Sequence, residues 1–183
     1  MSARIATTCA RPGIGMRAQK TGLIINVSSV LGFLPAPFMG IYAASKHALE
    51  GMSKSLDHEI REFGVRVVLL EPTSTNTKLE VNAAQTAAPI GVYASQFQAT
   101  VNAVQNQIKS APSAHFMAQK IADVIAGRYK LRQPVGGEAT LLARVRRFMS
   151  ARAVDGSLRK TLGFAKGIDT SRPPPLTDPL TAP

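Results

Sequence analysis

The chain of 183 residues has the length of one domain, and its 45% of apolar residues suffice for a buried core, which excludes a fully disordered protein. Lys and Arg number 22 against 11 Asp and Glu, so the net charge is +11. The single cysteine, Cys9, excludes a disulfide framework and a multi-thiolate site, and we expect no metal. Because we find no secretory signal and no apolar run near the ~20 residues of a membrane span, we expect a cytoplasmic protein without such a span.

A strand–helix–strand unit is predicted in the first half of the chain. Residues 23–28 form a short, β-branched apolar run, and residues 65–71 repeat this pattern before Pro72. Between the two runs, side chains recur at steps of three and four along a helix of about 22 residues, which Gly64 closes. This helix stripe comprises Tyr42, Lys46, Leu49, Ser53, Leu56, Ile60 and Phe63. Such a unit has parallel strands, so the predicted fold class is α/β.

Four further elements are expected downstream: helices at 95–109 and 114–127, a short strand within 128–137 and a helix at 138–150. The apolar side of the last helix is expected to carry Leu141, Leu142, Val145 and Phe148. From Thr170 onward the chain is too rich in proline to fold. We therefore expect one α/β domain over residues 1–167 and a disordered tail over residues 168–183.

Three side chains with complementary chemistry fall near the start of the long helix. Ser29 follows the first strand directly, at the strand end where α/β sheets bind their ligands. Tyr42 and Lys46 are one helical turn apart and share a face. An ammonium about 5 Å from a phenol stabilises the phenolate by roughly 3 kcal/mol, which favours proton exchange near neutral pH. The three residues therefore predict proton transfer to a carbonyl or alcohol oxygen that Ser29 holds by a hydrogen bond.

The motifs around these residues resemble the short-chain dehydrogenase/reductase family. Asn-Val-Ser-Ser-Val-Leu-Gly at 26–32 is followed by Tyr-Ala-Ala-Ser-Lys at 42–46, and the spacing of Ser, Tyr and Lys fits the family. Glu-Pro-Thr-Ser-Thr-Asn-Thr at 71–77 looks like the loop that contacts nicotinamide in these enzymes. The resemblance covers roughly residues 16–165.

The resemblance implies an NAD(P)-dependent oxidoreductase that transfers hydride between nicotinamide and a carbonyl or alcohol substrate. Tyr42 would be the general acid/base, Lys46 its electrostatic partner, and Ser29 the anchor of the substrate oxygen. Cofactor contacts are implied for Tyr42, Lys46, Pro72, Thr75 and Thr77. The cofactor would be NAD or NADP, with NADP slightly favoured, and the chain is expected to form a homo-oligomer or to associate with related subunits.

The nucleotide-binding half departs from the family pattern. A dinucleotide fold has two βαβαβ halves, yet only ~20 residues precede the first predicted strand. Thr8 to Gly15 match the family's glycine-rich loop except for Cys9 in a glycine position, which either an internal deletion or chance explains. Thr73 stands where many members have glycine. We therefore expect an incomplete Rossmann-like sheet with additional C-terminal helices, an exposed sheet edge at 23–28, weakened cofactor binding and little activity.

Two other functions stay open at this point. The chain could be a non-catalytic remnant that associates with intact dehydrogenase subunits. Residues 128–166 also hold ten Lys and Arg against Glu138 and Asp155, so a basic module for nucleic acid or anionic membrane is the rival from another class. Its basic residues include Arg144, Arg146, Arg147, Arg152, Arg159 and Lys160. Since no nucleic-acid motif is present, we do not expect a nucleic-acid partner.

Overall fold

Three parallel strands form the centre of the molecule. The computed structural model describes residues 15–76, 91–127 and 130–161. The strands are β1 (Gly22–Val27), β2 (Val65–Pro72) and β3 (Arg132–Val135), and they lie in the order β1-β2-β3. Residue Gly22 pairs with Val65 at one end of β1, and Val27 pairs with Leu70 at the other. The predicted α/β class and the three predicted strands are thereby confirmed.

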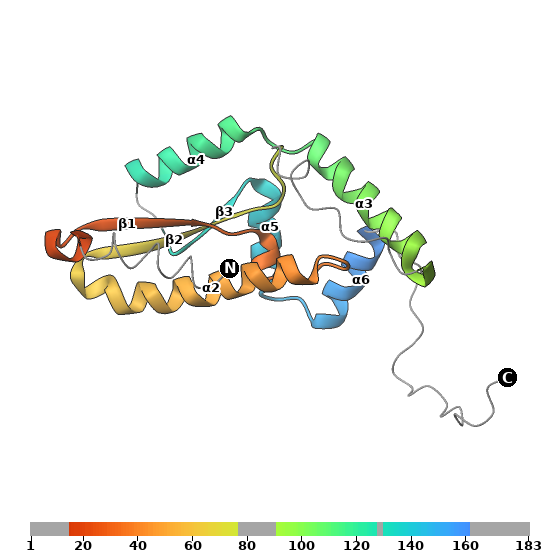
Figure 1. Ribbon diagram of the computed structural model, residues 1–183, viewed down its shortest axis with the longest axis horizontal. Coiled ribbons are helices and arrows are strands. Elements are labelled where there is room, and N and C mark those ends of the chain that lie inside the picture. The colour runs from red at the N-terminus through yellow and green to blue at the C-terminus, as the bar shows by residue number, and fades with distance from the viewer. Residues whose placement is uncertain (1–14, 77–90, 128–129, 162–183) are drawn as a thin grey trace, which may run out of the picture.

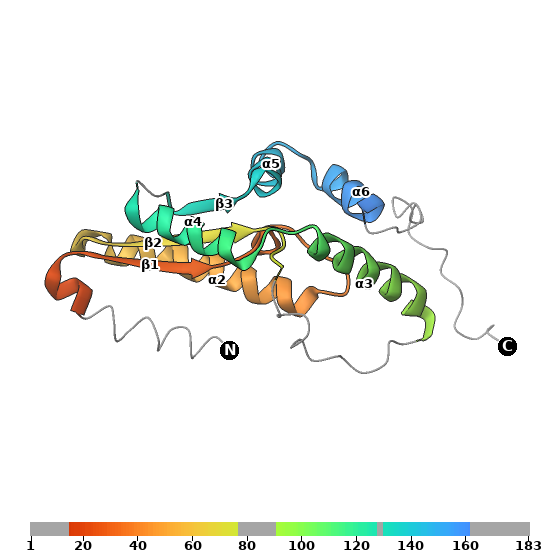
Figure 2. The same ribbon diagram turned by 90° about the horizontal axis from the view of Figure 1, so that it is seen from above.

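Helices surround this sheet. They are α2 (Gly40–Ile60), α3 (Ala94–Lys109), α4 (Ala114–Ala126), α5 (Gly137–Arg146) and α6 (Ala151–Thr161), with 3-10 turns η1 (Val30–Gly32), η2 (Arg61–Phe63) and η3 (Gly91–Tyr93). α2 and α4 cover opposite faces of the sheet (Figure 1). Seen from above, α5 and α6 continue on the β3 side, away from β1 (Figure 2). Within the described ranges, no helix combines the length and apolar character needed to cross a bilayer.

Alternation along β2 divides the core between the two faces. Val68 and Leu70 point toward α4 and form an apolar cluster with Val124 and Val135. Val67, Leu69 and Glu71 are the alternate positions, and all three are fully buried. β1 repeats this division, because Ile25 joins the α4 cluster whereas the Asn26 amide donates to the Ser53 hydroxyl of α2 at 2.9 Å.

The buried face of α2 is polar, which differs from the predicted stripe. Its buried residues are Ala43, Glu50, Ser53 and Asp57. Of the predicted stripe only Ser53 is fully buried, while Leu49 and Leu56 are half-buried. The observed face differs from the predicted stripe because apolar periodicity assigns charged residues to solvent, whereas here the buried carboxylates of Glu50 and Asp57 have cationic partners. Gly64 does close this segment, with φ of +72° after η2.

The predicted helix at 138–150 is wrong in extent, and its apolar side is correct for Leu142 but wrong for Leu141 and Phe148. α5 ends at Arg146, and Ser150 then caps a separate helix, α6, whose Ala153 N–H donates to the Ser150 hydroxyl. The side of α5 that packs inward carries Ala139 and Leu142, which meet Val30, Leu34 and Val154 in a second apolar cluster. Leu141 and Phe148, predicted on the apolar side, are 61% and 84% exposed.

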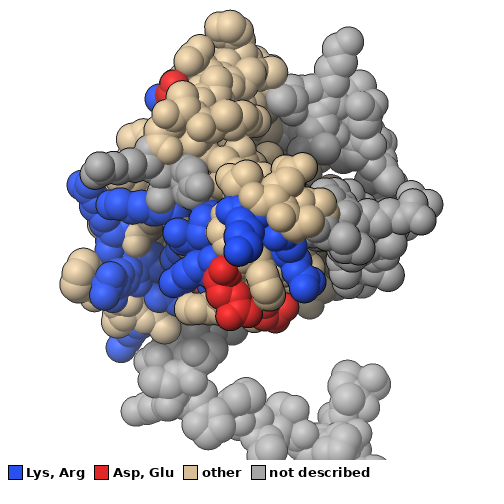
Figure 3. All heavy atoms as spheres, turned by 90° about the vertical axis from the view of Figure 1, so that its left-hand side faces the viewer, with Lys and Arg blue, Asp and Glu red and all other residues tan. Residues whose placement is uncertain are grey.

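Basic side chains are unevenly distributed over the surface. Figure 3 shows the end of the molecule at which β1 and β2 begin, where Lys and Arg cover much of the face beside a smaller group of Asp and Glu. Two of the arginines near this end, Arg61 and Arg66, bond Asp57, and Arg17 lies 4.5 Å from the ring centre of Phe63. The predicted tail at 168–183 lies outside the described residues.

Candidate active site

Ser29 lies where the carboxyl ends of β1 and β2 meet. It is 4% exposed and forms the N-terminal cap of η1, accepting a hydrogen bond from the Leu31 N–H at 3.2 Å. Its hydroxyl donates to the carbonyl oxygen of Pro72, the last residue of β2, at 3.4 Å. The side chain therefore joins two strand ends, at the edge of a parallel sheet where ligands commonly bind.

Lys46 reaches the same strand ends from α2. Its ammonium donates to the carbonyl oxygen of Val27, the last residue of β1, at 2.9 Å. The nitrogen also lies 5.6 Å from the ring centre of Tyr42, one helical turn earlier. Partial burial lowers the pKa of Lys46 from its ordinary value. The structure thus brings Lys46 and Tyr42 together and places Lys46 and Ser29 at the carboxyl ends of neighbouring strands.

The predicted cofactor contacts follow β2. Pro72 ends the strand, and Thr75 is half-buried in the segment after it. The next residue, Asn76, donates its backbone N–H to the Pro112 carbonyl at 2.9 Å and bridges to Ser113, the cap of α4. The described part of this loop is thereby fixed against the start of α4. Thr77 lies outside the described residues, as does Cys9 with nearly all of the predicted glycine-rich loop.

A buried cluster of charges, which the sequence analysis missed, lies beside the end of β2. Glu50 of α2 and Glu71 of β2 are 2% and 0% exposed. The Arg132 guanidinium of β3 approaches Glu71 at 2.5 Å and Glu50 at 3.7 Å, and Lys54 pairs with Glu50 at 3.1 Å. Burial, with the Glu50 carboxylate nearby, raises the pKa of Glu71 to about 7 despite Arg132. A glutamate at the end of an apolar strand, directly before Pro72, was the available signal.

A second missed group fixes the opposite end of β2. The fully buried Asp57 carboxylate accepts hydrogen bonds from Arg61 at 2.5 Å, from Arg66 at 2.9 Å and from the Val67 backbone N–H at 2.9 Å. Burial alone would raise the pKa of Asp57, but these hydrogen bonds lower it to about 2. The four-residue spacing of Asp57 and Arg61 on one helix was visible in the sequence.

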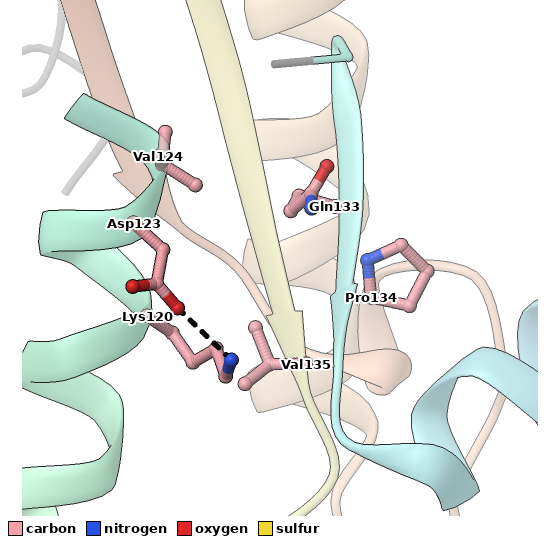
Figure 4. A pocket seen from close by; sticks show the side chains of 6 residues that line it. All are labelled: Lys120, Asp123, Val124, Gln133, Pro134 and Val135. Atoms are coloured by element: carbon pink, nitrogen blue, oxygen red, sulfur yellow. Dashed lines mark hydrogen bonds and ion pairs between the residues drawn. The ribbon is translucent and has the colours of Figure 1, made fainter. Parts of the chain in front are cut away.

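A shallow pocket lies on another part of the sheet. Figure 4 shows Lys120 and Asp123 of α4 paired at 3.0 Å, opposite the β3 residues Gln133 to Val135. Its lining includes none of Ser29, Tyr42, Lys46, Pro72 or Thr75. The predicted catalytic side chains therefore lie at the carboxyl ends of β1 and β2 and do not line this pocket.

Residues 5–88 match a protein-family model described as short chain dehydrogenase. Among curated proteins, a 3-ketodihydrosphingosine reductase of Bacteroides thetaiotaomicron is 44% identical over 62 residues, which are 34% of this chain and 23% of that protein. An uncharacterised oxidoreductase of Escherichia coli, YbbO, is 32% identical over 143 residues, which are 75% of this chain and 48% of the relative. The chain spans at most about half the length of these relatives.

A solved structure shares the fold. A short chain dehydrogenase from Burkholderia cenocepacia, crystallised in complex with NADP, superposes with a TM-score of 0.55 over 75% of this chain and 47% of its own. Its sequence is 20% identical, so this likeness concerns the fold. The predicted Rossmann-like arrangement of the parallel sheet agrees with it.

Proposed function

Because the chain belongs to the short-chain dehydrogenase family, we propose that it is an oxidoreductase that interconverts a carbonyl and an alcohol with NAD or NADP. The single observation that carries this proposal is the position of Lys46, whose ammonium bonds the end of β1 and lies 5.6 Å from the Tyr42 ring. The oxidoreductase names of the curated relatives agree with the reaction class. NADP is the first cofactor to test, because the structural neighbour was crystallised with it.

The N–H donors of Lys46 fit the ribose of such a cofactor. An ammonium has three N–H donors, and in the described part of the chain Lys46 has one hydrogen-bond acceptor, the Val27 carbonyl. The remaining donors suit the neighbouring hydroxyls of a ribose. Pro72 and Thr75 would line the nicotinamide end, since Pro72 ends β2 and Thr75 follows it at the same edge of the sheet, and we propose Thr77 as a further contact on the resemblance alone. The bound dinucleotide would supply or accept the hydride.

The side chains divide the proton chemistry among them. Tyr42 would give its phenolic proton to the carbonyl oxygen during reduction and take it back during oxidation. Lys46, held at the strand end, would stabilise the negative charge on Tyr42 while the proton is away. Ser29 would hold the substrate oxygen by a hydrogen bond, exchanging its present acceptor, the Pro72 carbonyl, for that oxygen. A small carbonyl or alcohol compound is accordingly the substrate class.

We test the proposal with the full chain, NADPH or NADH, and a panel of ketones and aldehydes. Tyr42→Phe should lower kcat at least 100-fold, because it removes the hydroxyl that carries the transferred proton. Lys46→Met should weaken cofactor binding as well. Tyr93→Phe is the matched control, since Tyr93 is 52% exposed, belongs to η3 and has its ring against Phe38. Equal rates for the Tyr42→Phe and Tyr93→Phe variants would exclude Tyr42 as the acid.

Measurement of cofactor binding distinguishes the oxidoreductase from the alternative, a non-catalytic subunit. If the chain is a non-catalytic subunit that associates with intact relatives, the purified chain binds neither dinucleotide and turns over no substrate. Titration with NADPH distinguishes the two, because the oxidoreductase requires saturable binding that Lys46→Met weakens. Saturation at micromolar NADPH would contradict our expectation that the affinity is reduced, while supporting the reaction itself.

A further inference from the structure

Two large apolar side chains are exposed on α5 and in the turn after it. Leu141 lies on α5, and Phe148 lies in the following turn, where its N–H bonds the Val145 carbonyl at 2.9 Å. Their side chains are 61% and 84% exposed. The other side of the helix is occupied, because Ala139 and Leu142 pack against the apolar cluster around Val30. The core is therefore formed without Leu141 and Phe148, and both side chains are available at the surface.

Four exposed arginines lie close to this pair in the sequence. Arg144, Arg146 and Arg147 belong to α5 and the turn after it, and Arg152 lies in the first turn of α6. All four are exposed, and within residues 130–161 none of their side chains has an ion pair or a hydrogen bond. The acidic residues of this segment are only Glu138 and Asp155. We call Leu141, Phe148 and these four arginines the α5–α6 patch.

We propose that the α5–α6 patch docks the protein on the surface of an anionic lipid bilayer. Exposed apolar side chains accompanied by basic residues are the pattern of interfacial helices, which insert apolar groups at the headgroup boundary while basic groups contact lipid phosphates. The net charge of +11 attracts the whole molecule to such a surface. Docking here is peripheral, in keeping with the lack of a long apolar helix in the described ranges.

The composition of the patch favours lipid over nucleic acid. A single-strand binding surface stacks successive bases on several aromatic rings, whereas this patch offers one ring, Phe148, and a leucine that cannot stack. Leucine and phenylalanine both gain free energy from transfer into acyl chains. Single-stranded RNA is therefore the competing ligand in the test.

The test is co-sedimentation of the full chain with phosphatidylcholine vesicles, with and without phosphatidylserine. We expect binding only to the anionic vesicles, decreasing with salt. Arg146→Gln/Arg147→Gln should weaken it about 25-fold, since each basic residue near the surface contributes about fivefold. Phe148→Ser should weaken it about tenfold or more. Circular dichroism confirms that each variant is folded.

Matched controls distinguish the effect of the α5–α6 patch from the effects of the protein's overall charge and hydrophobicity. Lys20→Gln/Lys109→Gln removes the same net charge at exposed positions on other elements, and Ile125→Ser removes a 65% exposed apolar side chain from α4. Both controls should change vesicle binding less than twofold. Equal loss from the control and patch variants, equal binding to neutral vesicles, or tighter Phe148-dependent binding to RNA would each overturn the proposal.

Discussion

The guanidinium of Arg132 on β3 donates to the buried carboxylate of Glu71 on β2 at 2.5 Å, across 61 residues of sequence. It also faces Glu50 and lies 4.8 Å from the ring centre of Phe33. One side chain therefore connects the second and third strands to α2 and to the turn after β1. Pro72, the residue after Glu71, belongs to the candidate active site, and its carbonyl oxygen accepts a hydrogen bond from the Ser29 hydroxyl.

Replacement of Arg132 by Met should lower the free energy of unfolding at pH 7 by about 2–4 kcal/mol, because Glu50 and Glu71 then share a buried site without their guanidinium. Urea denaturation measures the change. The double variant Arg132→Met/Glu71→Gln should recover at least half of it. Lys120→Met is the control, with an effect below about 0.5 kcal/mol because its partner Asp123 is exposed. A single Arg132→Met variant as stable as the wild type would contradict this account.

The stability of the protein should fall as the pH rises from about 4.5 to about 7. In this range native Glu71, with its pKa raised to about 7, still holds a proton that the unfolded chain has released. The proton stabilises the folded state fully below pH 4.5, and that contribution of about 3 kcal/mol is lost as the pH passes 7. Urea unfolding at half-unit pH intervals measures the slope. Glu71→Gln should flatten it; an unchanged slope in this variant would assign the effect to another group.

Asp57→Asn should destabilise the protein by about 2–4 kcal/mol at pH 7, since the buried carboxylate accepts from Arg61, Arg66 and the Val67 N–H. The low pKa of Asp57 means that its contribution is present above pH 3.8 and is lost as the pH falls through 2. Thermal unfolding should therefore show a smaller difference between wild type and variant at pH 3 than at pH 7. Asp123→Asn, on the exposed face of α4, serves as the control.

Gly64→Ala should cost more stability than Gly136→Ala, although both glycines have positive φ, +72° and +93°. A Cβ at Gly64 would lie 2.1 Å from the backbone carbonyl oxygen of Lys20, whereas a Cβ at Gly136 meets nothing within 4 Å. Gly136→Ala then carries only the strain of a backbone region that glycine alone adopts readily, about 1–3 kcal/mol, whereas Gly64→Ala combines left-handed strain with a backbone clash. Equal melting temperatures for the two variants would show that the Lys20 turn moves freely.

The sequence predicted what local patterns determine. The βαβ unit and the Gly64 closure follow from short-range periodicity and turn chemistry, and the Tyr42–Lys46 proximity follows from one helical turn. Contacts between distant segments were beyond these patterns. Glu50 and Asp57 read as surface residues because their partners, Arg132 and Arg66, come from strands elsewhere in the chain.

In the second half of the chain, local patterns also failed, because an apolar residue predicted on the buried side of a helix is exposed. Phe148 was assigned to the core because it continues an apolar period, yet the core against η1 is already filled by Ala139, Leu142 and Val154. The break between α5 and α6 was missed because Ser150 is an ordinary cap residue, and its neighbours Met149 and Ala151 favour helix on either side. The contact of Ser29 with Pro72 likewise required the strand register.

The order of the strands along the chain determines which part of the sheet can form while the chain is being synthesised. β1, α2 and β2 are contiguous in sequence and pair directly, so they can assemble as the nascent chain leaves the ribosome, before β3 has been translated. During that interval Glu50 and Glu71 face each other without Arg132. When β3 joins β2, Arg132 reaches both carboxylates, so strand pairing and charge compensation occur in the same step.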